Sequence, residues 1–228
     1  MQSVKPQGFT LIELMISISI LSLLLFTGSY SYSLMSERWS KELGQFSQSA
    51  KTTKNLENLQ RLLEGVHSFV LKDRQKKPSF FFIGGEDSLL ASSRSGLFSG
   101  DFPELFRLTA IKKENSLVDL IYQSASSQNV LLIDTEQSID FTNKIILFKD
   151  LDAVSFQYFG WSSLRQKLDA SENNLKPQWF SHYSGIDNQL MPQLLAVTLT
   201  FQGNSLTFYA HLEQRPERWL SFYLEDIE

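Results

Sequence analysis

The residues whose type and position most suggest chemistry lie at the N-terminus of the chain: Gly8, Phe9 and Glu13. Glu13 is a carboxylate near the start of a long apolar run. A charge there costs on the order of 2.5–3.5 kcal/mol at a helix centre and less near an interface, so it requires a partner. The positive end of a helix dipole is one such environment. Gly8, which has no Cβ, leaves the backbone open to a protease.

The rest of the sequence contains no known catalytic motif and no known metal-binding motif. The histidines His67, His182 and His211 are far apart, and there is no H-E-x-x-H motif and no cysteine. No G-x-S-x-G elbow, P-loop or G-x-G-x-x-G motif occurs. Asp150 and Asp152 have calcium-loop spacing but lack the glycine and the distal glutamate, so we interpret them as strand caps. We therefore predict that the protein is not an enzyme and has no cofactor or metal site.

The apolar run is long enough to cross a membrane as one helix. No charged residue occurs from Leu14 to Ser36, and this stretch spans roughly 34 Å as a helix, against a bilayer core of about 30 Å. A cleaved secretory signal is disfavoured, because its apolar region is typically about 7–15 residues long and an A-x-A-like site should follow. A plain membrane anchor is an alternative. Lys5 on the short flank predicts a cytoplasmic N-terminus and a translocated body.

The hexapeptide Gly8-Phe9-Thr10-Leu11-Ile12-Glu13, followed by this apolar helix, resembles the processing motif of type IV pilins and of type II secretion pseudopilins. The resemblance implies that a prepilin peptidase cleaves between Gly8 and Phe9, that Phe9 is then N-methylated, and that the apolar helix is retained. It also implies that Glu13 faces the N-terminal amine of a neighbouring subunit during assembly.

The rest of the chain fits one compact domain of ordinary size, with 228 residues and a formal net charge of −4. This charge does not support nucleic-acid binding. Apolar residues at helical steps extend the helix to about Leu71. They are Leu43, Phe46, Ala50, Leu56, Leu59, Leu63, Val66 and Val70. The segment 51–55 is its weakest point, and the basic cluster Lys72, Arg74, Lys76 and Lys77 with Pro78 is expected to end it.

The predicted organisation follows from these boundaries. Residues 1–8 form a leader peptide, 9–36 a transmembrane and assembly helix, 37–77 its amphipathic continuation, and 78–228 a β-rich periplasmic head. Alternating apolar residues predict antiparallel strands in the head. They lie at 106–113, 116–123, 129–135, 144–150, 151–160, 194–201 and 205–212. Residues 84–103 and 161–190 are expected to be long loops. The fold class is therefore α+β and pilin-like.

A second resemblance lies in the head. LDAVSFQYFGW, then PQWFSHY, then LMPQLLAVTLTF are similar to the C-terminal half of J-type minor pseudopilins. In that group an aromatic strand leads to a tryptophan-bearing loop, and a Leu-Pro step, here Met191-Pro192, opens a further strand. The usual acidic-glycine turn is replaced by Phe159-Gly160-Trp161. Trp161 and Trp179 are expected either to pack beneath a loop or to contact a partner.

Together the two resemblances imply a minor pseudopilin at the tip of a type II secretion pseudopilus, needed for assembly and protein export. Its partners would be I- and K-type minor pseudopilins, the major pseudopilin, the prepilin peptidase and methyltransferase, and inner-membrane lipid. It would cross the bacterial inner membrane once, with its N-terminus cytoplasmic and its head periplasmic. The alternatives are a minor type IV pilin that primes an adhesion or twitching pilus, and a membrane-anchored periplasmic binding module.

Overall fold

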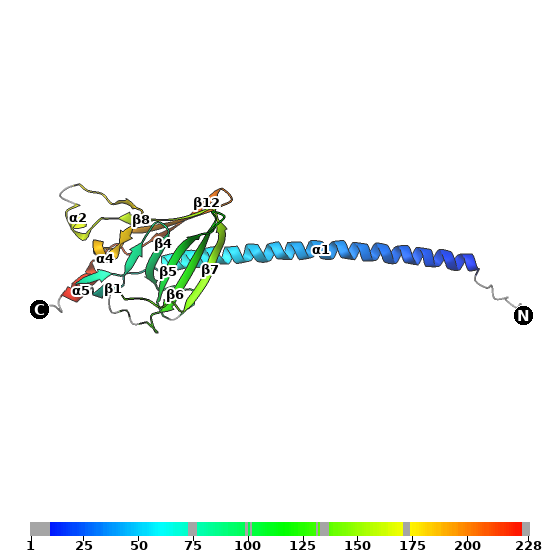
Figure 1. Cartoon of the computed structure of the whole chain (residues 1–228), viewed down its shortest axis with the longest axis horizontal. Coiled ribbons are helices and arrows are strands. Elements are labelled where there is room, and N and C mark those ends of the chain that lie inside the picture. Colours follow the sequence, from blue (N-terminus) through cyan, green and yellow to red (C-terminus); the bar gives the residue numbers. More distant parts are fainter. Residues whose placement is uncertain are drawn as a thin grey trace, which may run out of the picture. The chain divides into compact units, whose positions relative to one another are not determined.

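The computed structural model of the chain describes residues 10–72, 77–98, 100, 102–130, 132, 137–170 and 174–224. The chain divides into two compact units, Met1–Thr53 and Lys54–Glu228. One helix, α1 (Leu11–Glu64), provides the described part of the first unit and the first element of the second (Figure 1). It is helical through residues 51–55, so the low helix propensity of that segment does not interrupt it.

The second unit, which we call the head, contains mainly antiparallel strands. In chain order these are β1 (Val70–Lys72), β2 (Pro78–Phe80), β3 (Phe82–Gly84), β4 (Ser88–Ser93), β5 (Glu104–Lys112), β6 (Val118–Ser126), β7 (Asn143–Leu151), β8 (Ala153–Gly160), β9 (Gln178–Phe180), β10 (Tyr183–Ser184), β11 (Leu194–Phe201) and β12 (Asn204–His211). Short helices α2 (Leu164–Leu168), α4 (Gly185–Asn188) and α5 (Arg218–Leu224) complete it. A long helix followed by antiparallel sheets confirms the predicted α+β class and is consistent with a pilin-like fold.

The strands form three sheets. The largest has the order β10-β3-β4-β5-β6-β7, the second has the order β12-β11-β8-β9, and β1 pairs with β2 alone. One buried cluster joins the two larger sheets to the last turns of α1. Its α1 members Leu59, Leu62 and Leu63 are fully buried. Aromatic rings bridge the sheets within it: Phe82 and Tyr158 meet edge to face with centroids 5.7 Å apart.

The helix ends earlier than the sequence periodicity predicts, at Glu64 rather than near Leu71. After it, the Arg94 N–H donates to Gly65 O at 2.9 Å, and the His67 N–H donates to Ser92 O at 3.2 Å. The chain is thus held along the end of β4 instead of continuing the helix. The predicted helical continuation to residue 77 is therefore wrong.

The residues that prolong the apolar stripe in the sequence have other roles in the structure. Val66 forms an isolated bridge with Ser93, and Val70 begins β1. Pairing with strands buries these side chains as well as a helix would, so periodicity alone did not distinguish the two outcomes. Of the basic cluster, Lys72 is in β1 and Lys77 precedes β2, while residues 73–76 lie outside the described residues.

The predicted strands are mostly found, with ends that shift by one to three residues, and 194–201 coincides with β11. Three predictions need correction. The segment 84–103 is not one loop, because it contains β4, whose Leu89 and Ala91 are fully buried. The described residues of 129–135 are not in a strand. The segment 161–190 contains α2, β9, β10 and α4, so it too is not a plain loop.

Candidate functional site

The N-terminal end of α1 holds Glu13 in a reciprocal capping arrangement with Thr10. The Thr10 backbone N–H and hydroxyl both donate to Glu13 Oε2, at 3.1 and 2.9 Å, and the Glu13 backbone N–H donates to Thr10 Oγ1 at 3.4 Å. This is the S/T-x-x-E capping box, which satisfies backbone donors that the first helical turn leaves unpaired. Glu13 therefore has a local structural role.

The capping box leaves part of the carboxylate available. Within the described residues, Glu13 Oε1 accepts no hydrogen bond, since both bonds from Thr10 end on Oε2. The sequence suggested a helix-terminus role and, by resemblance, an intermolecular one. The geometry accommodates both, because one oxygen caps the helix and the exposed residue keeps a second oxygen without a described hydrogen bond. The predicted processing residues Gly8 and Phe9 lie outside the described residues.

The apolar part of α1 covers Leu11–Trp39, the one stretch among the described residues that is long and apolar enough to cross a membrane. Its large apolar side chains are exposed: Leu11 is 80% exposed and Phe26 72%. Contiguous exposed apolar surface of this kind marks contact with a membrane or with other proteins. Within the described residues of the first unit, which form a single helix, nothing packs over this surface.

Three hydroxyls in this apolar stretch satisfy a hydrogen bond within the helix. Each of the three donates to the carbonyl four residues earlier, as Ser and Thr do in membrane helices. The bonds are Ser17 Oγ to Glu13 O (2.8 Å), Ser19 Oγ to Met15 O (2.8 Å) and Thr27 Oγ1 to Leu23 O (2.7 Å). The segment thus needs no water for these groups, as a lipid environment requires.

Exposed aromatic residues follow the most apolar part of the helix. Tyr30, Tyr32 and Trp39 are each at least 60% exposed. Tyrosine and tryptophan are enriched where membrane helices meet the polar interface. The sequence interpretation did not use these residues, although their place at the end of the uncharged run was a usable signal.

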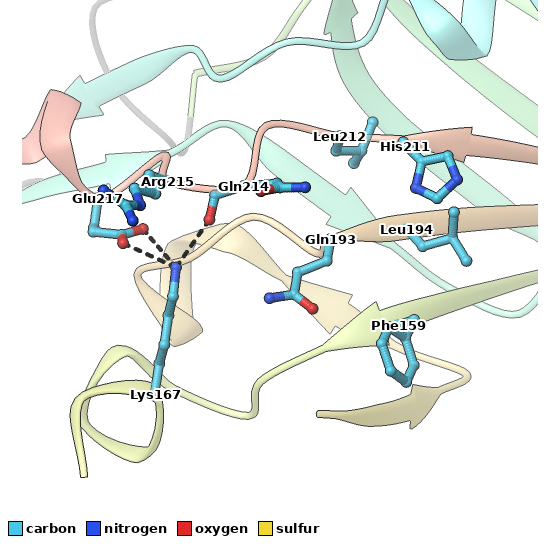
Figure 2. Close-up of a pocket in the computed structure, with 9 residues that line it drawn as sticks. All are labelled: Phe159, Lys167, Gln193, Leu194, His211, Leu212, Gln214, Arg215 and Glu217. Carbon is cyan, nitrogen blue, oxygen red and sulfur yellow. Dashed lines mark hydrogen bonds and ion pairs between the residues drawn. The ribbon is translucent and has the colours of Figure 1, made fainter. Parts of the chain in front are cut away.

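The head contains a cavity of about 500 Å³ between the ends of β8, β11 and β12, helix α2 and the segment before α5. Figure 2 shows the Lys167 ammonium pointing toward the Glu217 carboxylate and the Gln214 carbonyl. Lys167 Nζ donates to both Glu217 oxygens, at 2.9 and 2.8 Å, and to Gln214 O at 3.1 Å. These bonds use all three protons of the amine, so Lys167 acts here as a tie between segments.

The other side of the cavity is a mixed surface, with Gln193 between the Lys167 tie and the side chains of Phe159, Leu194 and His211 (Figure 2). No nucleophile, base and orienting group come together there. The surface could hold a small polar ligand against an aromatic ring, but it contains no catalytic arrangement.

Histidine and aspartate side chains do not combine into a metal site. The described residues contain no group of three or more His, Asp or Glu side chains able to hold a metal ion. Asp150 and Asp152 have separate structural roles. Lys113 Nζ bonds Asp150 Oδ1 at 2.8 Å and Asp119 Oδ1 at 2.7 Å, and the Gly203 N–H donates to Asp152 Oδ2 at 2.8 Å.

Lys113, Asp119 and Asp150 form a cluster, and its hydrogen bonds shift the pKa values of Lys113 and Asp119. Burial alone would raise the pKa of Asp119, but hydrogen bonds from Lys113 and from the Asp150 N–H outweigh it and lower that pKa. The bonds to Asp119 and Asp150 raise the pKa of Lys113. The cluster therefore links the residue after β5 to β6 and β7; Asp150 lies within β7, one residue before its end.

The three histidines also have separate environments. His67 lies just after α1 instead of on it, half-buried, with an edge-to-face contact to Phe69 at 6.4 Å between ring centroids. Burial and the Arg94 guanidinium lower its pKa. His182 Nδ1 lies 3.1 Å from Ser181 Oγ, within hydrogen-bond distance. His211 is the last residue of β12.

The tryptophans of the 161–190 segment differ in exposure. Trp179 on β9 is 45% exposed and lies against Phe159 with ring centroids 5.2 Å apart, so it does not pack beneath a loop. Trp161 is half-buried, and its carbonyl accepts a bond from the Tyr183 hydroxyl at 2.9 Å. Of the two, Trp179 is the one open to a partner.

Comparison with known proteins adds one finding. Residues 5–28 match the prokaryotic N-terminal methylation motif. No curated protein matches the chain. The chain therefore carries a type IV pilin-like prepilin signal followed by an apolar helix. Such a signal indicates processing by a prepilin peptidase and assembly with other pilin-like subunits.

Proposed function

We propose that this protein is a minor pseudopilin, J-like, at the tip of a type II secretion pseudopilus, where it serves assembly and protein export. The observation that carries the proposal is the N-terminal methylation motif at residues 5–28. It begins a helix whose apolar side chains are exposed. The mechanism is assembly, not catalysis: cleavage after Gly8 frees the amine of Phe9, which is then methylated, and the helix passes from lipid to neighbouring helices.

Glu13 sets the register of that assembly. Its Oε2 caps its own helix through Thr10, while Oε1 receives the Phe9 amine of a neighbouring subunit. An ammonium–carboxylate bond in a dry interface is strong and specific, since an unpaired carboxylate there is costly. Cleavage and charge pairing are thus linked, because only a processed neighbour presents an amine at this depth.

The head supports the J-type assignment by its arrangement. The three segments that resemble J-type pseudopilins form β8, β9 and β11, which are neighbours in the four-stranded sheet. Met191 and Pro192 are buried just before β11, as a step into that strand requires. Segments far apart in sequence that meet in one sheet are more informative than the same segments scattered over the surface.

The chain would be a single-pass protein of the bacterial inner membrane, with its N-terminus in the cytoplasm and its head in the periplasm. Its partners would be the I- and K-type minor pseudopilins and the major pseudopilin. Co-purification tests this subclass. The full chain is co-expressed with tagged I- and K-type subunits, the membranes are solubilised in detergent, and the chain should be retained with the tagged subunits. Retention only by minor type IV pilins would assign the chain to a pilus instead.

The capping box allows a sharp test of the role of Glu13. Glu13→Gln keeps a capping side chain but removes the charge, whereas Thr10→Ala removes the cap but keeps the charge. We expect Glu13→Gln to insert into the membrane and be cleaved but to fail in co-purification with its partners, and Thr10→Ala to assemble. The measurement is the fraction of chain retained with tagged partners. Normal assembly of Glu13→Gln would restrict Glu13 to capping.

A further inference from the structure

Strand β12 (Asn204–His211) forms one edge of the four-stranded sheet in the head. It pairs only with β11, in a continuous register from Leu194↔His211 to Phe201↔Asn204. No other described strand lies on its far side. An edge strand presents unpaired N–H and C=O groups, which makes it a template for another chain.

The β11–β12 turn determines which backbone groups are unpaired. Its two-residue loop, Gln202 and Gly203, has positive φ angles of 50° and 75°, as in a type I′ hairpin. In such a hairpin the closing pair, Phe201 and Asn204, exchanges hydrogen bonds, and bonded pairs then recur at every second residue. The bond from Leu212 N–H to Gln193 O, at 2.9 Å, continues this alternation beyond the strand.

The remaining residues of β12 direct their backbone groups away from β11. These residues are Ser205, Thr207, Tyr209 and His211. Within the described part of the chain, their outward groups form no backbone hydrogen bond beyond the strand ladder. A row of alternating donors and acceptors along eight residues matches the backbone of one extended peptide.

The other long edge strand of the head, β7, has features that hinder the addition of another strand. Strand β12 lacks them. Strand β7 carries register shifts where it pairs with β6 and charged residues at Lys144, Lys149 and Asp150. In addition, Asn55 Nδ2 donates to Leu147 O at 2.6 Å. These are the usual devices against strand addition, and edges β9 and β10 are only three and two residues long. Strand β12 has no charged residue, no proline and no register shift.

A groove beside β12 indicates what an added strand would carry. A cavity of about 380 Å³ lies between Phe208 and the last turns of α1, where its lining includes Leu56 and Glu57. Leu206, on the same face of β12, is 48% exposed. Every second side chain of an added strand would point toward this groove and cover these apolar groups.

The rim of the groove favours a positive charge. The groove is lined by two carboxylates, Glu57 and Glu64, and one guanidinium, Arg61. Arg61 donates to the neutral amide of Asn58 and Glu64 accepts from that of Gln60, so the net charge of the rim is negative. Glu57 has no hydrogen-bond or ion-pair partner within the described residues, and it is exposed at the groove. A basic side chain in the added strand would pair with it.

We propose that β12 is a docking strand for an extended segment of another polypeptide, which joins the sheet beside β12, puts alternate apolar side chains into the groove and places a lysine or arginine at Glu57. A second copy of β12 fits less well, because that strand contains no lysine or arginine. The site lies wholly within the head, so it does not depend on the proposed filament role.

The test uses the purified full chain in detergent and two labelled peptides, TVTKTVTV and TVTETVTV, with fluorescence anisotropy as the readout. The lysine peptide should bind about threefold more tightly than the glutamate peptide, as for an exposed ion pair. Glu57→Lys should reverse this preference. That variant changes only an exposed side chain, so it reports on the groove even if other variants fold poorly.

The matched backbone variants are Thr207→Pro and Thr207→Val. Proline removes the outward N–H and leaves the bonds to β11 intact, so it should weaken binding about tenfold or more. Valine keeps the N–H but removes the hydroxyl that bonds Thr198 Oγ1 at 2.9 Å. It should bind the lysine peptide like the parent chain.

Hydrogen exchange locates the bound peptide. Binding should slow exchange of the Ser205, Thr207, Tyr209 and His211 amides and leave those of Leu206 and Phe208 unchanged, because the latter already bond β11. No binding of either peptide at about 1 mM would overturn the proposal. Equal binding by Thr207→Pro, an unchanged preference in Glu57→Lys, or cross-linking of β12 between two copies would also overturn it.

Discussion

The two ends of helix α1 contain the same residue types in opposite environments. In the first unit, Leu21, Leu23, Leu24 and Leu25 are 57–66% exposed, whereas in the head Leu59, Leu62 and Leu63 are fully buried. Apolar burial contributes about 25 cal/mol per Å² of area removed from water. The head obtains this stabilisation from its own sheets and the last turns of α1, whereas the described helix of the first unit buries none of these leucines.

Polar groups differ between the two regions in the same way. Three hydroxyls in the apolar stretch, those of Ser17, Ser19 and Thr27, bond carbonyls of their own helix. In the head, Ser93 Oγ donates to Leu62 O at 2.8 Å, from a strand to the helix. The bonds of the three hydroxyls are local to one helix, whereas the Ser93 bond depends on the tertiary packing of the head.

The largest difference is expected from truncating leucines in the two regions. Leu62→Ala should destabilise the head by about 2–5 kcal/mol, because it removes a fully buried side chain and leaves a cavity. Leu24→Ala, at a 64% exposed position, should leave head unfolding unchanged. Chemical denaturation of the full chain in detergent, followed by circular dichroism of the β-rich head, measures both. Equal effects would contradict the assignment of separate environments.

Substitution of two glycines by alanine should have smaller effects on stability, with opposite signs in the two regions. A Cβ at Gly84 would lie 2.2 Å from Tyr158 Cζ, in the core, so Gly84→Ala should cost about 1–3 kcal/mol. A Cβ at Gly28 would meet nothing within 4 Å, so Gly28→Ala should raise helix stability by up to about 1 kcal/mol.

Thermal unfolding of the head measures the effect of Gly84→Ala, and the helix content of the membrane-embedded chain measures the effect of Gly28→Ala. Tyr158→Phe is the control for the head, because it keeps the ring but loses the hydroxyl bond to Gly85 O (2.9 Å). A head of unchanged stability in Gly84→Ala would refute the close packing of β3 on β8.

The smallest expected effect is a pH dependence that belongs to the head alone. Burial and Arg94 lower the pKa of His67 below its usual 6.5. The unfolded chain then binds more protons than the folded chain, so stability is full above pH 6.5 and is lost as the pH falls through the folded-state pKa. His67→Gln should flatten the slope of unfolding free energy against pH below pH 6.5. The same slope in His67→Gln and in the parent chain would contradict the buried environment of His67.

The sequence predicted the fold class and most strands, because alternating apolar residues report directly on half-buried antiparallel strands. It did not predict the end of α1, since Val66 and Val70 suit a helix stripe and a strand equally well. Strand β4 was missed for a related reason: its Ser92 and Ser93 are typical of loops, yet both are buried, and Ser93 bonds Leu62 O. Such tertiary bonds leave no periodic signal in the sequence.

Part of the candidate site could also be predicted from the sequence, and part could not. A local hexapeptide was enough to locate Glu13 and the expected cleavage at Gly8, because that signal is contiguous in sequence. The Thr10–Glu13 capping box also follows a sequence pattern, three residues apart, although its geometry came only from the structure. The β12 edge was not predictable, because which strand lies at an edge depends on pairings between distant segments.

The central claim is that the N-terminal helix is processed and then exposed for assembly. Mass spectrometry of the mature N-terminus, on chain purified from cells with and without prepilin peptidase, tests this claim most directly. The account predicts a chain that begins at Phe9 and carries one added methyl group when the peptidase is present, and a chain that retains residues 1–8 when it is absent. An unprocessed Met1 in peptidase-containing cells, or cleavage beyond Gly28, would contradict it.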